Sequence, residues 1–170
     1  RSSAASDVYK RQLLSEGLGM MPKNKIMFVC TGNTCRSPMA EAVFNRFAEE
    51  KGLAVRAESM GTTTVTGMPV SENSVEVCKE IGIDISDMHS TAYSDKKLDE
   101  YDKFYCMSTS HKFFLMTQCA VPADKIEVIN VADPYMCGVE VYRQCRDEIC
   151  SAVKEILKQY ELSLIHISEP

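Results

Sequence analysis

The chain has 170 residues, 45% of them hydrophobic, and a formal net charge of −5 at pH 7. Acidic surfaces repel phosphate backbones and anionic headgroups, so we expect neither nucleic acid nor a membrane as a partner. No apolar run is long enough to span a bilayer, and no secretory signal opens the chain, so we expect a cytoplasmic location. Since the cytoplasm keeps thiols reduced, we do not expect the eight cysteines to form a disulfide framework.

The two ends of the chain contain segments that complementary strands of the same DNA could encode. Residues 7–12 (DVYKRQ) and 162–167 (LSLIHI) can be read from the two strands of one DNA sequence. Such an inverted pair resembles the transposase adapters attached to sequencing fragments, so we exclude residues 1–12 and 162–170 from the expected fold. Removing them leaves 16 basic and 22 acidic residues, a net charge of −6, and we expect residues 21–161 to form one domain.

Strands and helices alternate along the interior. Residues 26–30 (IMFVC) are an unbroken apolar run ending in a Gly-Asn turn, as expected of a central parallel strand. A helix follows, which Ser37 can cap and Gly52 ends. The later elements are expected as strands at 54–59, 103–107 and 126–129, and as helices at 70–81, 110–119 and 139 to about 160. This order predicts an α/β fold: a single-domain, open, parallel four-stranded sheet with helices on both faces.

The loop after the first strand, residues 30–37 (CTGNTCRS), lies where ligands bind in such folds, beyond the carboxyl end of a strand. Consecutive backbone amides can converge there into a nest for an anion, and the helix behind the loop adds its positive end. Gly32 and Asn33 tolerate the positive φ angles that a tight loop needs. The residues expected to bind phosphate are Thr31, Gly32, Asn33, Thr34, Cys35 and Arg36.

Three side chains of this loop favour phosphoryl transfer through sulfur. Cys30 is the candidate nucleophile, and the positive field is expected to lower its thiol pKa below the free value of about 8.5. Arg36 offers a planar fork that can grip two oxygens of a phosphoryl group. Ser37 can donate a hydrogen bond to the sulfur of Cys30.

A thiolate that attacks a phosphate also needs its leaving group protonated, so a carboxylic acid must face the loop from elsewhere in the chain. Asp133 is the candidate. It opens the sequence DPY after the last expected strand, and Pro134 stiffens the segment that holds it.

These residues resemble the low-molecular-weight protein tyrosine phosphatase family, whose signature VCxGNxCRSPMAEA is matched by residues 29–42 and whose later DPY element is matched by residues 133–135. The resemblance covers nearly all of residues 25–160. It implies a flavodoxin-like fold and a hydrolase that forms a cysteinyl-phosphate. It assigns catalysis to Cys30, Arg36 and Asp133, and a supporting hydrogen-bond network to Asn33, Ser37 and Ser59.

Cys35 lies five residues after Cys30, and in the family an equivalent thiol can form a reversible disulfide that protects the nucleophile. A small apolar filler is the alternative interpretation of Cys35.

Three positions bear on the substrate. Thr34 stands where tyrosine-specific members carry Ile or Leu, and GNTCRSP resembles the branch that removes phosphate from arginine. Thr presents an oxygen to a guanidinium, although neutral drift would also explain it. Val65 stands where tyrosine-specific relatives place an aromatic wall, and Tyr135 is the wall that remains. We expect a phosphoarginine protein as substrate, with phosphotyrosine as the alternative, and a monomeric enzyme.

The histidines and the remaining cysteines are not assigned to the site. His89 is displaced from the place where family members brace the loop Asn, and His111 is typical of a helix start. The chain has no CxxC pair, so we expect neither a metal nor a cofactor.

Two rival functions are disfavoured. Arsenate reductases share the loop but resemble CTGNSCRSQ and carry two cysteines seven apart, whereas Cys78 stands alone and Cys137 and Cys145 are eight apart. A phosphopeptide-binding module without turnover would have lost Cys30 or Asp133, and both are present.

Overall fold

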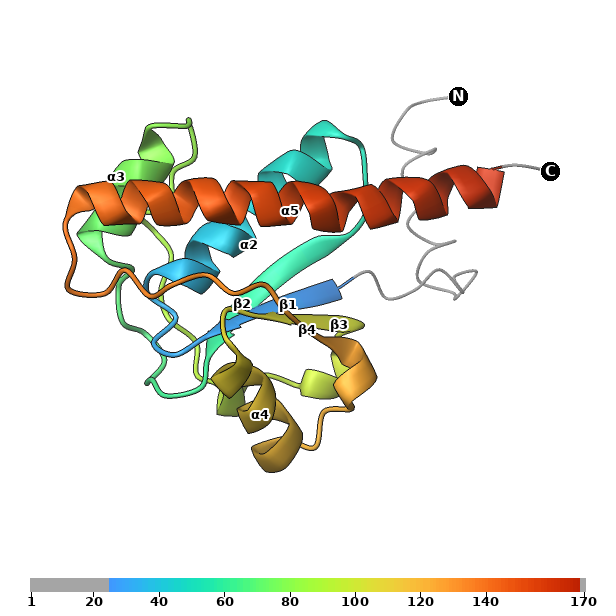
Figure 1. The fold of residues 1–170 in the computed structure, drawn as a ribbon, viewed down its shortest axis with the longest axis horizontal. Coiled ribbons are helices and arrows are strands. Elements are labelled where there is room, and N and C mark those ends of the chain that lie inside the picture. The colour runs from blue at the N-terminus through green and yellow to red at the C-terminus, as the bar shows by residue number, and fades with distance from the viewer. Residues whose placement is uncertain (1–24, 169–170) are drawn as a thin grey trace, which may run out of the picture.

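The computed structural model describes residues 25–168, with side chains described as far as Leu162. Its strands form one sheet in the order β2-β1-β3-β4, and every neighbouring pair is parallel (Figure 1). The strands are β1 (Lys25–Cys30), β2 (Arg56–Gly61), β3 (Lys103–Cys106) and β4 (Ile126–Val128). The predicted parallel α/β sheet is confirmed.

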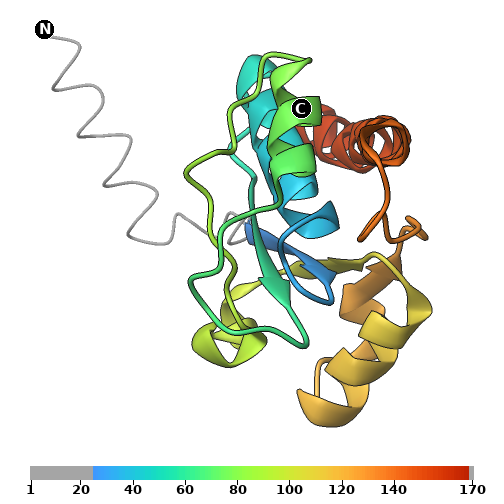
Figure 2. The ribbon, with the colours of Figure 1, turned by 90° about the vertical axis from the view of Figure 1, so that its left-hand side faces the viewer.

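Helices cover both faces of this sheet. They are α2 (Arg36–Glu50), α3 (Glu72–Lys79), α4 (Thr109–Gln118) and α5 (Val139–Ser168). Figures 1 and 2 show α2, α3 and α5 on one side of the sheet and α4 on the other. Side chains of β1 alternate between the two cores: Phe28 packs on the α2 and α5 side, whereas Met27 and Val29 pack on the α4 side. This double burial explains the unbroken apolar run of β1.

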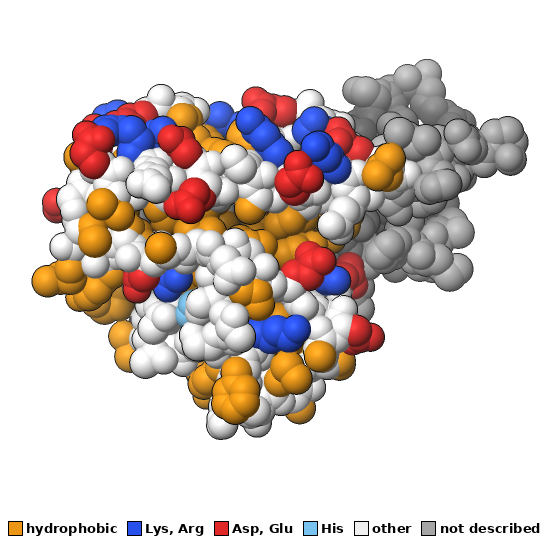
Figure 3. Space-filling view, in the orientation of Figure 1, with side chains coloured by type: hydrophobic (Ala, Val, Ile, Leu, Met, Phe, Trp, Pro, Cys, Tyr) orange, Lys and Arg blue, Asp and Glu red, His pale blue; other side chains and the backbone are white. Residues whose placement is uncertain are grey.

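Helix α5 shows how a single apolar stripe holds the α2 and α3 side together. An apolar stripe is buried or partly buried along the helix at Tyr142, Cys145, Ile149, Val153, Ile156 and Tyr160. On its exposed side, acidic and basic side chains are interspersed rather than separated (Figure 3). The helix therefore buries one stripe and keeps the opposite side solvated.

Several element boundaries differ from the sequence-based expectation. β2 begins at Arg56 rather than at 54 because its ladder starts opposite Lys25, the first residue of β1. α3 is shorter than expected because Ser71 caps it, accepting a hydrogen bond from the backbone N–H of Ser74 at 3.2 Å. Three-residue 3₁₀ turns at Tyr93–Asp95, Leu98–Glu100 and Ala123–Lys125 were not predicted, since such short turns have no repeating pattern.

The ends of the chain bear on the expected domain limits. Residues 1–12 lie outside the described residues, whereas α5 runs on to Ser168 instead of ending near 160. The helix continues because residues 161–168 contain no Gly or Pro that would stop it. Among the described residues, no helix combines the length and apolar character needed to cross a membrane.

Candidate active site

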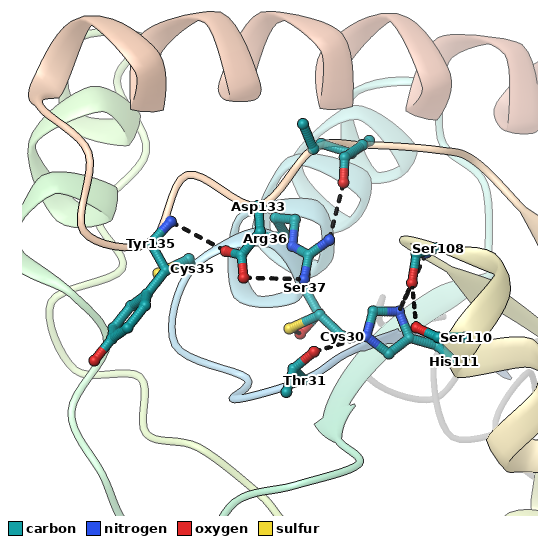
Figure 4. Close-up of polar contacts among 12 residues, drawn as sticks. Cys30, Thr31, Cys35, Arg36, Ser37, Ser108, Ser110, His111, Asp133 and Tyr135 are labelled. Carbon is teal, nitrogen blue, oxygen red and sulfur yellow. Dashed lines mark hydrogen bonds and ion pairs between the residues drawn. The ribbon is translucent and has the colours of Figure 1, made fainter.

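A pocket of about 340 Å³ opens beyond the carboxyl end of β1. The loop from Cys30 to Arg36 forms its floor and joins β1 directly to the first residue of α2 (Figure 4). The other residues lining the pocket come from two later loops and are Thr64, Met68, Asp133 and Tyr135. The position beyond a strand end is the one expected for a ligand site in a parallel α/β fold.

Cys30 is almost completely enclosed, with 2% of its surface exposed. Its Sγ lies 2.7 Å from Ser37 Oγ and accepts a hydrogen bond from the backbone N–H of Asn33 at 3.3 Å. Burial raises the pKa of the Cys30 thiol, and the contacts of Ser37, Arg36 and Asn33 oppose this increase without cancelling it. The expected lowering of this pKa is therefore wrong in net direction, because desolvation depends on packing that the sequence does not display.

Arg36 is held at the inner wall of the pocket. Its buried guanidinium donates from Nη1 to the carbonyl oxygen of Val131 at 2.9 Å, and its Nη2 lies 3.6 Å from Asp133 Oδ2. The Asp133 side chain is 51% exposed, and its Oδ1 accepts a hydrogen bond from the backbone N–H of Tyr135 at 3.0 Å. The structure thus brings the sulfur, the guanidinium and the carboxylate to one pocket (Figure 4).

Asn33 connects the loop to the neighbouring strand β2. Its backbone has a positive φ of 56°, and its Nδ2 donates to Ser37 Oγ at 2.7 Å and to Ser59 Oγ at 2.9 Å. These are the hydrogen bonds that the family resemblance predicted. The sequence did not predict two further members: the backbone N–H of Thr91 donates to Asn33 Oδ1 at 2.7 Å, and Ser59 Oγ donates to Glu41 Oε1 at 2.6 Å.

Two local expectations about the loop are corrected. Gly32 does not have a positive φ, so Asn33 supplies the left-handed residue. Ser37 does not cap α2, because the helix already begins at Arg36 and Ser37 lies buried in the first turn beside Cys30. The Ser37 hydroxyl contacts the sulfur of Cys30 instead of capping the helix.

Gly61 was not predicted to matter, yet the loop packs on it. A Cβ at this position would lie 2.7 Å from the carbonyl oxygen of Thr31 and 3.1 Å from the Cβ of Asn33. The backbone N–H groups of Thr62 and Thr63 donate to the carbonyl oxygens of Cys30 and Thr31, both at 3.0 Å. The end of β2 therefore supports the loop through these backbone contacts as well as through the side chain of Ser59.

Of the expected substrate-selecting residues, Thr34 and Tyr135 line the pocket and Val65 does not. Val65 is 66% exposed, because its carbonyl turns inward to accept a hydrogen bond from Ser90 Oγ at 2.7 Å and its side chain points outward. The same loop instead contributes Thr64 and Met68 to the pocket. Val65 therefore does not line the pocket in this structure, and its part in substrate selection stays a prediction.

Cys35 is buried on the α5 side of the loop. Its Sγ lies 3.3 Å from the hydroxyl of Tyr142 and 3.6 Å from Ser71 Oγ. Both Cys30 and Cys35 are free thiols in this structure.

The two histidines whose side chains are described, His89 and His111, differ in their relation to the loop. His89 is exposed, with Nδ1 3.0 Å from the carbonyl oxygen of Asp87, and Thr91 instead braces Asn33. His111 is 3% exposed, and its Nε2 lies 2.9 Å from Thr31 Oγ1. The sequence signal that could have indicated this contact is the start of a helix, STSH, directly after a strand that ends beside the loop.

A family model and several known proteins match most of this chain. The sequence pattern of the family described as low molecular weight phosphotyrosine protein phosphatase matches residues 25–163. The protein-arginine-phosphatase of Bacillus subtilis (strain 168) is 32% identical over 143 residues, which cover 79% of this chain and 95% of that protein.

Two solved structures extend the likeness to the fold. The low molecular weight protein tyrosine phosphatase from T. tengcongensis has a TM-score of 0.76 and 38% identity, covering 79% of this chain and 98% of that chain. A mutant of the YwlE arginine phosphatase with a phosphorylated active site serine has a TM-score of 0.77 and 31% identity, covering 81% of this chain and 95% of that chain.

Proposed function

Because this chain belongs to the low molecular weight phosphotyrosine protein phosphatase family, and is therefore a cysteine-dependent protein phosphatase, we propose that it removes phosphate from arginine side chains of proteins. The observation that carries the chemistry is the meeting of Cys30, Arg36 and Asp133 in one pocket. The preference for arginine is supported by Thr34 in the lining of that pocket and by the protein-arginine-phosphatase relative.

In the first step, Cys30 attacks phosphorus as a thiolate, the form that its contacts with Ser37, Arg36 and Asn33 favour against burial, and the bond from phosphorus to the leaving nitrogen breaks. Asp133, as the carboxylic acid, donates its proton to that nitrogen, so arginine leaves as a neutral base that then takes up a proton from water. Arg36 and the loop amides hold the three equatorial oxygens, on which charge is spread in the transition state. The product on the enzyme is a phosphocysteine.

In the second step, water attacks the phosphocysteine and the sulfur–phosphorus bond breaks. Asp133, now a carboxylate, takes a proton from the attacking water, and Cys30 leaves as a thiolate. The hydroxyl of Ser37 and the backbone N–H of Asn33 lie close enough to stabilise this leaving group. The same two contacts therefore serve attack and departure.

The test of the substrate is a side-by-side assay on phosphoarginine and phosphotyrosine peptides. We expect the wild-type protein to have the higher kcat/KM on phosphoarginine. Thr34→Ile should shift the ratio of the two kcat/KM values toward phosphotyrosine by about tenfold, since an added apolar surface favours a ring and removes an oxygen that faces the guanidinium.

A matched control is Thr64→Ile, which adds the same group to another threonine of the pocket lining. It should leave the ratio within about twofold of wild type, a change of less than about 0.5 kcal/mol in discrimination. An unchanged ratio in the Thr34 variant would refute the selecting role of that residue, and a higher wild-type rate on phosphotyrosine would refute the arginine assignment.

Regulation by oxidation is proposed for the same loop. A peroxide would convert the thiolate of Cys30 to a sulfenic acid, and the thiol of Cys35 would then displace water to form a disulfide. The buried contact of Cys35 with Tyr142 must open for this to happen. We further propose that the enzyme is a cytoplasmic monomer, that residues 21–161 form its domain, and that it acts on proteins without a metal or cofactor. Its acidic net charge supports the proposal that it binds neither nucleic acid nor membranes.

A further inference from the structure

His111 contacts the catalytic loop from the opposite side of the sheet to α2. It lies in the first turn of α4, which covers the face of the sheet away from α2 and α5 (Figure 1). Figure 4 shows its ring between the start of α4 and Thr31. The two ring nitrogens bridge these elements, since Nδ1 faces Ser108 and Nε2 faces Thr31.

The partners of the ring fix where its proton lies. Nδ1 lies 3.0 Å from the Ser108 hydroxyl, which can donate or accept, and 3.2 Å from the backbone nitrogen of Ser108, which can only donate. The backbone contact therefore requires a lone pair on Nδ1. Burial first, and then the charge of Arg36, lower the pKa of His111 to about 4, so the ring is neutral at pH 7. The single proton of the ring is therefore on Nε2, and it is donated to Thr31 Oγ1 at 2.9 Å.

This contact determines how the Thr31 hydroxyl can be used. With its oxygen occupied as an acceptor, the hydroxyl keeps its own hydrogen for another partner. Thr31 is exposed and lines the pocket, one residue after the nucleophile. Its side chain is thus a donor held at the edge of the space that a phosphoryl group would fill.

We propose that His111 is a positioning residue that, as the Nε2-protonated tautomer, turns the Thr31 hydroxyl toward the pocket as an extra hydrogen-bond donor to the phosphoryl group. This inference rests on the proposed phosphatase function for the nature of the ligand, and on the described contacts for the geometry. It adds α4 to the elements that shape the site.

The first test is the protonation state of the ring, which does not depend on turnover. In protein labelled with ¹⁵N at histidine, the imidazole couplings of His111 at pH 7 should show the proton on Nε2 and none on Nδ1. A proton on Nδ1, or a doubly protonated ring, would overturn the inference.

The second test separates the two ends of the ring. His111→Asn places an amide oxygen near the position of Nδ1, where it can accept from Ser108, but it is too short to reach Thr31. His111→Gln can extend its amide nitrogen toward Thr31. We expect the Asn variant to lower kcat/KM on a phosphoarginine peptide about three- to tenfold, which is the range for one hydrogen bond. Competitive inhibition by inorganic phosphate should weaken by a similar factor. The Asn variant should also be less active than the Gln variant.

Thr31→Val is the second single variant of a double-mutant cycle that pairs Thr31 with His111. It should cause the same loss as His111→Asn, and the double variant should be no worse than either single variant, because His111 acts through Thr31. Since Thr31 lies at the rim, this variant keeps the inference testable if the substitutions at the buried His111 fail to fold. Thr109→Ala, exposed on the same turn of α4, is the control and should retain wild-type kcat/KM.

The outcomes discriminate between the inference and the proposed function. A His111→Asn or Thr31→Val protein with kcat/KM within about twofold of wild type, or losses that multiply in the double variant, would overturn the positioning role. A wild-type protein that neither releases phosphate nor binds it would instead overturn the proposed function, and the tautomer measurement would still stand.

Discussion

Two opposing effects determine the pKa of the Cys30 thiol: burial raises it, and a few polar contacts lower it. Burial is the larger effect on its pKa, and the hydroxyl of Ser37 is the first contact that opposes it. The sequence made the loop residues recognisable because they are contiguous. It did not reveal the net pKa, which depends on how the rest of the chain closes over the sulfur.

Ser37→Ala should therefore raise the pKa of Cys30 further, because it removes a contact that lowers it. The rate of alkylation by iodoacetamide, measured against pH, should show its midpoint displaced to higher pH than in wild type. Loss of one hydrogen bond to a charged group predicts a decrease of about 10- to 100-fold in kcat at pH 7. An alkylation profile that coincides with wild type would contradict this role of Ser37.

Asp133→Asn should lower kcat by about 10²- to 10⁴-fold, the usual contribution of a positioned general acid. The free energy of unfolding should change by less than about 1 kcal/mol, because the Asp133 side chain is half-exposed, its contact with the buried Arg36 is long at 3.6 Å, and Arg36 keeps its hydrogen bond to Val131. Stopped-flow kinetics and urea unfolding measure the two effects. The same change at the exposed Asp124 is the control, and equal kcat values for the two variants would refute the assignment of Asp133 as proton donor.

At the scale of elements, α3 and α5 are joined by charged groups as well as by apolar packing. Glu80 accepts hydrogen bonds from Arg143 at 2.7 and 2.9 Å and from Arg146 at 2.7 Å. The hydrogen bonds from Arg143, assisted by Arg146, lower the pKa of Glu80 to about 2. These contacts connect the end of α3 to the first turns of α5.

The lowered pKa gives the stability of the protein a defined pH dependence. Because the folded pKa of Glu80 is below its unfolded value of about 4.3, its contribution is fully present above that pH and is lost as pH falls toward 2. Urea unfolding should show wild type more stable than Glu80→Gln at pH 7, with the difference shrinking at pH 3. Glu76→Gln, exposed on the same helix, is the control, and a difference that stays constant with pH would contradict the prediction.

The elements also show what the sequence could and could not predict. β1 and α5 were recognisable because a buried strand and a one-sided helix leave continuous or periodic patterns. The orientation of Val65 was not, since it follows from a hydrogen bond to Ser90, which lies 25 residues further along the chain. His111 was missed for the same reason: its partner Thr31 lies 80 residues away in the sequence.

At the scale of the whole molecule, burial decreases toward the end of the described side chains of α5. Among the residues of α5 whose side chains are described, Leu157 is fully buried, Tyr160 is partly buried, and Leu162 is 60% exposed. Glu161 pairs with Lys51 at 3.0 Å and would be retained if the chain ended there. Residues 21–161 thus contain every described contact that supports the pocket.

A protein comprising residues 21–161 should therefore fold and act like the full chain. We expect kcat/KM to stay within about twofold and the free energy of unfolding within about 0.5 kcal/mol, as for changes at exposed positions. Side-by-side assays and urea unfolding check this. Loss of folded protein or of turnover on removing residues 162–170 alone would show that this segment belongs to the enzyme.

The close approach of Gly61 to Thr31 limits which substitutions at position 61 allow the enzyme to keep its activity. Even the smallest side chain at 61 would press on the Thr31 carbonyl and displace the loop that carries the nucleophile. In a library randomised at every codon and selected for turnover, position 61 should tolerate as little variation as Cys30 itself, although glycine contributes no atom to the reaction.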